Sequence, residues 1–311
     1  MKVFTFICTA LSAFSCLAAP SFYSVTEIGT LPGGDISQGL DLNNSGTVAG
    51  YGSNADGFEN AVVYNGALAP LDPLPGGRFS QAWGINSSGA IVGSSESWNG
   101  YQRAVIFDPS GAIDLGAFGP DEDSFARSIN DAGQITGFGT IGGSSHAFFY
   151  NGTSLQDLGT LGGSFSRGFD INNSGVIAGT SENASLFNRA FISQSGGALV
   201  DLGTLTGGNF SEAVSINDAG VVAGWADDEF GFIQAVTFQG PGNATPLGIL
   251  PGGNFSKATG INNLGQVVGL SGILTGQSSF LWDPNFGLVD LATLVQGSRF
   301  EEFYAYGIND L

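Results

Sequence analysis

The chain has few residues that could cross-link it or bind a metal. Of its 311 residues only two are cysteine and one is histidine. Cys8 and Cys16 both lie near the amino end, so the remaining chain has no disulfide to stabilise it. The single histidine, His146, excludes a histidine-rich metal site, and no motif around it indicates a catalytic triad. The fold must therefore depend on a packed core.

Positive charge is also scarce. Eight Lys and Arg residues stand against 27 Asp and Glu, which gives a formal net charge of −19. A surface of this sign repels phosphate backbones and anionic lipids, so we expect neither nucleic acid nor a bare membrane as partner. Charged residues are nevertheless only 11% of the chain and hydrophobic residues are 42%. Such a composition indicates a folded protein and not an acidic disordered segment.

Long apolar runs are absent beyond the amino end. Met1-Lys2 precedes the apolar stretch 3–13, and Cys16-Leu17-Ala18 resembles a cleavage site. We therefore expect residues 1–18 to be a secretory signal peptide and the protein to be secreted. Lipid attachment at Cys16 is the alternative, although the residues before it fit a lipoprotein signal poorly. No stretch approaches the roughly 20 apolar residues of a membrane span.

A motif does recur along the rest of the chain. Variants of the sequence LGTLGGSFSRGFDINNSGVIAG occur seven times. The intervals between its asparagines are 43, 44, 42, 45, 45 and 47 residues. A period of this length is typical of a modular repeat array. The asparagines are Asn43, Asn86, Asn130, Asn172, Asn217, Asn262 and Asn309.

Each unit predicts four short strands. In the unit 165–204 we expect strands at 166–171, 176–179, 189–192 and 198–202, separated by turns rich in Asn, Ser and Gly. No window of the mature chain has the apolar spacing of a helix. Four strands in about 44 residues predict an all-β fold, a β-propeller of four-stranded blades. A β-solenoid is the alternative.

The two ends of the array indicate six complete blades plus parts of a seventh. Residues 22–28 resemble a fourth strand without the preceding three, and 304–310 resemble a first strand. We expect residues 19–311 to form a single propeller domain that the amino-terminal strand helps to close. Because the last unit stops within its turn, we also expect the natural protein to continue beyond Leu311 with the two missing strands.

These motifs resemble the bacterial extracellular HAF repeat. LGTLGG, an S-x-A or S-x-G step, IN-x-x-G-x-V-x-G and the tripeptide His146-Ala147-Phe148 carry the resemblance, which covers residues 28–310. Other units degrade the tripeptide, as in Arg189-Ala190-Phe191. The resemblance implies a secreted bacterial protein of no assigned activity, with no catalytic residues to transfer. It also implies, as an alternative localisation, a cell-surface anchor in a C-terminal segment beyond Leu311.

Candidate binding residues lie where the repetition breaks. The second and third strands of each unit are joined by variable loops, and the third unit replaces its Gly pair with 119–123. In a propeller these segments share one face, where aromatic rings stack on sugars and carboxylates bind Ca²⁺. No cofactor is expected, with Ca²⁺ left open because no complete calcium-loop spacing is present. The candidate ligand-binding residues are Asp56, Phe58, Trp98, Tyr101, Asp121, Asp123, Asp227, Asp228 and Phe230.

The repeated residues themselves predict structure and not chemistry. The recurring Asn is expected to fix its hairpin by bonding backbone two residues on, and the Gly pairs lack the helix that a phosphate loop requires. The acidic residues lie mostly in outer loops, and the inner strands carry Ser, Ala and Gly with little repeated charge, Asp41 and Asp170 being the exceptions. We therefore expect a non-enzymatic binding or scaffolding module for an extracellular glycan or surface protein. The alternative is a carbohydrate-active propeller enzyme, a glycosidase or lyase.

Overall fold

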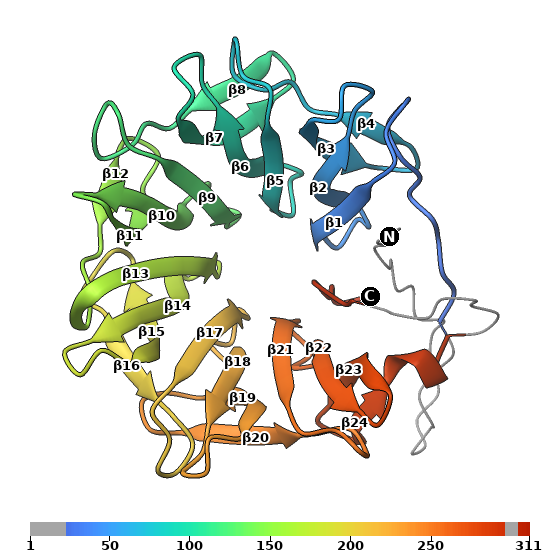
Figure 1. Ribbon diagram of the computed structural model, residues 1–311, viewed down its shortest axis with the longest axis vertical. Helices are drawn as coiled ribbons and strands as arrows, with labels where there is room; N and C mark the ends of the chain where they lie inside the picture. Colours follow the sequence, from blue (N-terminus) through green and yellow to red (C-terminus); the bar gives the residue numbers. More distant parts are fainter. Residues whose placement is uncertain (1–22, 296–303) are drawn as a thin grey trace.

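Six four-stranded antiparallel sheets are arranged as the blades of a β-propeller around a central axis (Figure 1). The computed structural model describes residues 23–295 and 304–311, so the predicted signal peptide lies outside the described residues. Within each blade the strands run in chain order from the axis to the rim, which is the topology predicted from the repeat. The one helical element described is a single 3₁₀ turn, η1, Leu291–Thr293, and no described helix is long and apolar enough to cross a membrane.

The strand bounds repeat from blade to blade. Blades 1 to 3 consist of β1 Ser37–Leu42, β2 Val48–Ser53, β3 Glu59–Tyr64, β4 Leu68–Pro70; β5 Ser80–Ile85, β6 Ile91–Glu96, β7 Gln102–Asp108, β8 Gly111–Asp114; β9 Ser124–Ile129, β10 Ile135–Ile141, β11 Ser144–Tyr150 and β12 Leu155–Asp157. Blades 4 to 6 consist of β13 Gly162–Ile171, β14 Val176–Asn183, β15 Asn188–Gln194, β16 Val200–Gly203; β17 Ser211–Ile216, β18 Val222–Asp227, β19 Ile233–Phe238, β20 Ala244–Gly248; β21 Ser256–Ile261, β22 Val267–Ile273, β23 Gly276–Asp283 and β24 Gly287–Asp290.

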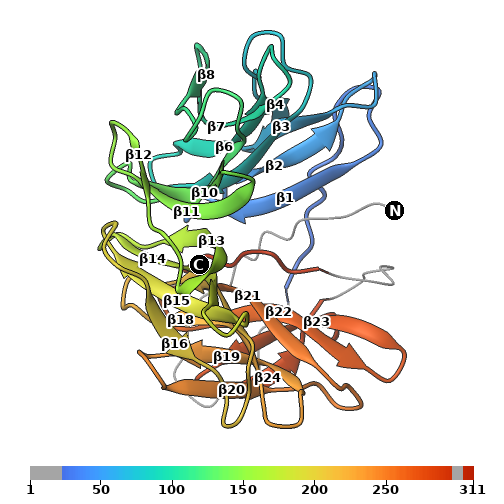
Figure 2. The same cartoon turned by 60° about the vertical axis from the view of Figure 1, so that its left-hand side comes forward.

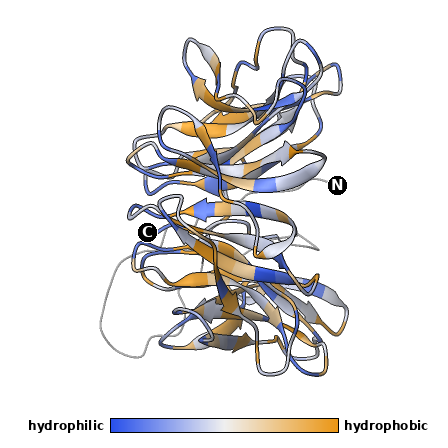
Figure 3. Cartoon of the chain, turned by 90° about the vertical axis from the view of Figure 1, so that its left-hand side faces the viewer, coloured by the Kyte–Doolittle hydropathy of each residue, from blue (hydrophilic) through white to orange (hydrophobic). Residues whose placement is uncertain are grey.

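The hydrophobic core is divided among the interfaces between neighbouring blades. Five clusters each join one blade to the next, and a sixth lies between blade 6 and residues Tyr23, Ala305 and Ile308. Figure 3 shows the hydrophobic residues concentrated along the strands, while the connecting loops are mostly polar. The third strands contribute most, because the alanine and the following Val or Phe of the HAF-like tripeptide are fully buried, as at Ala190 and Phe191. The tripeptide is therefore a packing motif.

A serine at the start of each inner strand connects adjacent blades. The Ser211 hydroxyl accepts a hydrogen bond from the Ala190 N–H of the preceding blade at 2.9 Å and donates one to the Gly203 carbonyl at 2.6 Å. Ser124, Ser166 and Ser256 make the same pair of bonds. These serines are fully buried, and they satisfy backbone groups that strand pairing leaves without a partner. The small residues of the inner strands thus have a defined role in closing the ring.

The seventh place around the axis holds a single segment. Residues 304–311 lie between β21 and β1, and the views in Figures 1 and 2 agree on this position. The outer strand expected at 22–28 is not formed in the described residues, where Tyr23 makes one parallel bridge with Val295. A fourth strand needs a third strand as its hydrogen-bonding neighbour, and the described residues place no such strand beside 23–28. Tyr23 instead packs with Ala305 and Ile308 in the sixth cluster.

The seven repeated asparagines form one closed ring of hydrogen bonds. Each side-chain amide donates to the backbone carbonyl of the next asparagine around the axis, at 2.9 to 3.2 Å. Asn262 donates to Asn309, and Asn309 donates back to Asn43, which closes the circle. Each side-chain oxygen also accepts from backbone N–H groups of its own turn, as predicted for the hairpin. The inter-blade half of this interaction was not predicted.

Replacing one asparagine of the ring tests its contribution. Asn172 is buried, donates to the Asn217 carbonyl and accepts from Ser174 N and Val176 N. Removing these bonds in Asn172→Ala leaves three backbone groups unsatisfied, and we expect the free energy of unfolding to fall by about 3 kcal/mol in urea titrations. The control Asn209→Ala, at an exposed side chain that makes no hydrogen bond to other described residues, should change it by less than about 0.5 kcal/mol. Equal losses in both variants would contradict the assignment.

Candidate functional site

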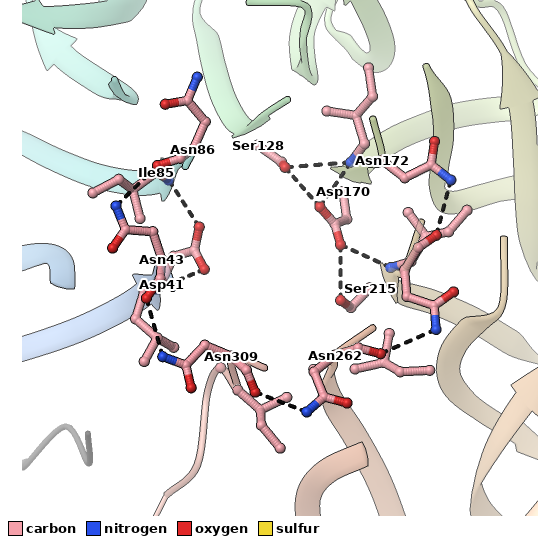
Figure 4. Close-up of a pocket in the computed structure, with 18 of the residues that line it drawn as sticks. Asp41, Asn43, Ile85, Asn86, Ser128, Asp170, Asn172, Ser215, Asn262 and Asn309 are labelled. Atoms are coloured by element: carbon pink, nitrogen blue, oxygen red, sulfur yellow. Dashed lines mark hydrogen bonds between the residues drawn. The ribbon is translucent and has the colours of Figure 1, made fainter. Parts of the chain in front are cut away.

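The inner strands surround an axial cavity of about 600 Å³ (Figure 4). All six inner strands run in the same direction along the axis, so successive residue positions form successive layers of the wall. At one end lie the hairpin turns with the asparagine ring, which we call the turn end. At the other lie the β2–β3-type loops and the connections between blades, which we call the loop end. The deepest lining residues toward the loop end are Gln38, Tyr51 and Glu212.

A β-bulge in each inner strand directs one side chain into the cavity. In blade 3 the register passes from Ala126 to Ser128, so Arg127 has no partner on β10. A bulge of this kind bends the strand and re-aims the extra side chain. The same position differs in every blade, and all of these residues line the cavity. They are Leu40, Trp83, Arg127, Phe169, Val214 and Thr259, with Tyr306 in the seventh place.

Two carboxylates face the cavity one layer nearer the turn end. Asp170 accepts four hydrogen bonds. One comes from Ile171 N in its own blade, one from the Ser128 hydroxyl in blade 3, and two from the Ser215 hydroxyl and Ile216 N in blade 5. It thereby joins blades 3, 4 and 5 (Figure 4). Asp41 accepts from Leu42 N at 2.8 Å and from Ile85 N at 2.9 Å, which joins blades 1 and 2.

The environment of Asp41 favours its protonated form. Burial is the largest effect and, with the negative charge of Asp170, raises the pKa of Asp41 to about 7, against the lowering effect of its two backbone hydrogen bonds. The pKa of Asp41 thus lies in the neutral range. Asp41 can therefore exchange a proton near neutral pH, whereas Asp170 is fully occupied by hydrogen bonds.

Three cationic side chains lie on the inner strands. They are Arg127, which lines the cavity, Arg167 and Lys257, and none of them was among the predicted site residues. Their heads stack on aromatic rings: Arg127 on Trp83 at 3.8 Å, Arg167 on Phe138 at 5.0 Å and Lys257 on Trp225 at 4.2 Å from the ring centre. Position-by-position comparison of the units would have found these residues, because they vary inside an otherwise constant S-x-A-x motif.

Glu212 is the acidic member of this layer. Burial raises the pKa of Glu212, while the Trp225 indole N–H, Lys257 and the two arginines act in the opposite direction. The indole donates to its carboxylate at 3.4 Å. The lining of the cavity is consequently uneven in charge: Asp41, Asp170 and the turn residues Asp131, Asp218 and Asp310 lie toward the turn end, and Arg127 and Glu212 lie further toward the loop end.

The loop end is also where exposed apolar side chains gather. Eight of the thirteen exposed large hydrophobic residues described lie on β2–β3-type loops or on the connections between blades; they are Ile36, Phe79, Trp98, Leu186, Phe210, Phe230, Phe232 and Leu274. The Gly pairs position these loops. A Cβ on the second glycine, as at Gly77, would overlap the Glu96 carbonyl, and the first, Gly76, lies against Trp98.

Several predicted binding residues are free at this face. Trp98 is 83% exposed and Phe230 is 75% exposed. Asp56 and Asp121 are exposed as well, whereas Phe58 and Tyr101 are half-buried. Phe58 packs edge-on against Phe79, with ring centres 5.1 Å apart. These residues belong to blades 1, 2, 3 and 5, so they share the face without forming one cluster.

The other predicted residues hold the backbone of the loops. Asp227 is buried and accepts from Asn209 N and Phe210 N, and Asp228 accepts from Phe230 N and Phe232 N. Asp123 accepts from Gln102 N. In the same region the Arg103 guanidinium donates to the carbonyls of Gly119, Pro120 and Glu122, which fixes the segment that replaces the third Gly pair. Across residues 23–295 and 304–311 no group of three or more His, Cys, Asp and Glu side chains is placed to hold a metal ion.

Comparisons with known proteins identify the fold and no closer relative. No family model matches the chain, and no curated protein matches its sequence. The β-propeller domain of the Trilobed protease from Pyrococcus furiosus is similar with a TM-score of 0.52 and 12% identity, over 83% of this chain and 84% of that one. The GH74 enzyme of Niastella koreensis gives a TM-score of 0.51 and 13% identity, over 82% of this chain and 36% of that one.

A third similar structure is TolB from Acinetobacter baumannii, with a TM-score of 0.44 and 15% identity over 65% of this chain. This chain spans half of TolB and about a third of the GH74 enzyme. At these identities the likeness establishes a β-propeller and nothing about activity.

The raised pKa of Asp41 predicts a specific dependence of stability on pH. Between the ordinary value of 3.8 and about 7 the folded state retains a proton that the unfolded state has lost, so stability falls as pH rises through this window. Relative to Asp41→Asn, the parent should lose up to about 1.4 kcal/mol per pH unit between pH 4 and 7. Urea titrations at four pH values would measure the difference. Asp72→Asn, at an exposed carboxylate, serves as control, and parallel curves for parent and Asp41→Asn would refute the prediction.

Proposed function

We propose that this chain is a secreted, non-enzymatic β-propeller that binds or scaffolds extracellular glycans or surface proteins on a bacterium. The concentration of exposed apolar side chains at the loop end is the observation that supports it best. Exposed apolar groups gathered on one face are typical of interaction sites, because isolated ones need no such arrangement. Secretion rests on the predicted signal peptide, and the bacterial setting rests on the resemblance to the HAF repeat.

The roles of the inner carboxylates favour binding over catalysis. A glycosidase needs one carboxyl group as acid and a second as base or nucleophile, each free to reach the substrate. Asp170 accepts four hydrogen bonds that join three blades. If Asp170 acted on a substrate instead, it would have to give up hydrogen bonds that hold neighbouring blades together. The free side chains, Trp98 and Phe230, carry no acid–base chemistry.

A glycan array provides the test of binding. The full chain should retain sugars on the array without releasing reducing ends. Comparing retention with and without EDTA decides whether Ca²⁺ contributes to binding. Trp98→Ala and Phe230→Ala should each weaken retention by about tenfold, since exposed aromatic rings supply most of the contact energy in such sites. Ile113→Ala, at a residue 49% exposed on the outer strand β8, is the matched control. Retention that is insensitive to both loop variants, or lost equally in the control, would exclude this face.

The carbohydrate-active enzyme remains the second candidate because of Asp41. Its pKa of about 7 is suited to a general acid at neutral pH, and it faces the same cavity as Asp170. If the chain is an enzyme, soluble polysaccharides should yield new reducing ends, and Asp41→Asn should abolish them while the fold, measured by circular dichroism, is kept. Absence of release by the parent across a polysaccharide panel would exclude this candidate.

A further inference from the structure

The distribution of cations in the channel indicates the chemical class of a ligand. Six of the eight Lys and Arg residues are described, and three of these six lie on the inner strands; Arg127 among them lines the axial cavity. This is a large share for a chain of net charge −19. The inference rests on the proposed binding function and specifies what the channel recognises.

These three cations differ from Arg103 and Arg189 in their partners. Arg189 forms an ion pair with Asp201 at 3.1 Å, and Arg103 donates to three carbonyls. In the described part of the chain, Arg127 has neither a hydrogen-bond partner nor an ion pair. Its contacts are the faces of Trp83 at 3.8 Å and Phe169 at 5.8 Å.

Stacking leaves the hydrogen-bonding edge of Arg127 free. A guanidinium that lies over an aromatic ring uses its face, while its five N–H donors point outward in the ring plane. Arg127 lines the cavity, so these donors are available within it. Burial and the charge of Arg167 lower the pKa of Arg127 to about 10, against the raising effect of the Glu212 carboxylate. A planar carboxylate matches such a fork with two parallel hydrogen bonds.

The surrounding wall fits a sugar better than a bare ion. Trp83, Phe169 and Tyr306 present rings around the same layer, and Gln38 and Tyr51 add amide and hydroxyl groups toward the loop end. A volume of about 600 Å³ lies in the range of small-molecule sites and greatly exceeds the size of one carboxylate. The carboxylates at the turn end repel a second negative charge, so a ligand with one acidic end is favoured.

We infer that the axial cavity binds an acidic saccharide, with the carboxylate of a uronic acid on Arg127 and with Arg167 and Lys257 attracting it from the loop end. Arg127 is the contact residue, and Trp83 positions it. Neutral sugar rings extend beside Phe169 and Tyr306.

Calorimetric titration of the full chain with cellobiouronate tests this inference. Its methyl ester is a neutral control of nearly the same shape. We expect the acid to bind at least about tenfold more tightly than the ester, with an affinity that falls as NaCl is raised. Arg127→Met should reduce binding of the acid by at least about tenfold and leave the ester unchanged, and Arg127→Lys should restore part of the loss. Arg78→Met, at an exposed cation stacked on Phe58 outside the cavity wall, should have no effect.

Other outcomes would overturn the inference in distinguishable ways. Equal binding of acid and ester, or binding that survives Arg127→Met, rules out the anionic site but leaves the proposed binding function intact. If neither the acid nor the ester binds but other sugars are retained on the array, the anionic site is likewise ruled out and the proposed binding function stands. Binding of tetraglycine with a free carboxyl end, but not of the disaccharide, replaces the saccharide with a peptide. Thermal unfolding of each variant establishes that it is folded. If the parent chain binds neither the disaccharides nor any sugar on the array, the proposed function itself is rejected.

Discussion

The closed ring of asparagine hydrogen bonds is the interaction on which the rest of the structure depends. A propeller has no strand pairing between blades, so its inner ends must be held by other means. Here one buried amide per repeat connects each blade to the next, and the seventh amide, Asn309, returns the circle to Asn43. The ring fixes the diameter of the channel, and the serine bonds and alanine packing then fix the tilt of each blade. A single incomplete place is tolerated because one segment, 304–311, supplies the required amide.

Most of the fold could be predicted from the repeat. Period, turn residues and β-branched runs indicated four strands per unit, and the observed β13 to β16 begin and end within a few residues of the expected bounds. The predicted outer strand at 22–28 was wrong because strand formation depends on neighbours that the pattern of one segment does not contain. The inter-blade bonds of the asparagines were also missed, since a local turn already explained that residue completely.

The site was harder to predict than the fold for a physical reason. A bulge adds one residue to a strand without changing its composition, so a single unit does not show that Arg127 or Phe169 points inward, and only the variation between units marks the position. The variable loops were predicted to be the binding site because they interrupt the repeat. Of the residues expected there, Trp98 and Phe230 are free, while Asp123, Asp227 and Asp228 hold backbone N–H groups. An acidic residue in a loop therefore indicated turn chemistry at least as often as an exposed ligand.

The Gly pairs separate the loops from the frame. The second glycine of each pair lies against a carbonyl at the end of the second strand and fixes the frame there, while the first touches one residue of the loop. That loop residue is Ala55, Trp98, Ala184, Glu229 or Leu274 in successive units that keep the pair. The same backbone thus accepts a methyl group, an indole, a carboxylate and an isobutyl group at equivalent points of one rim. This molecule is consequently a natural display scaffold, in which five positions can be diversified together without altering the ring beneath them.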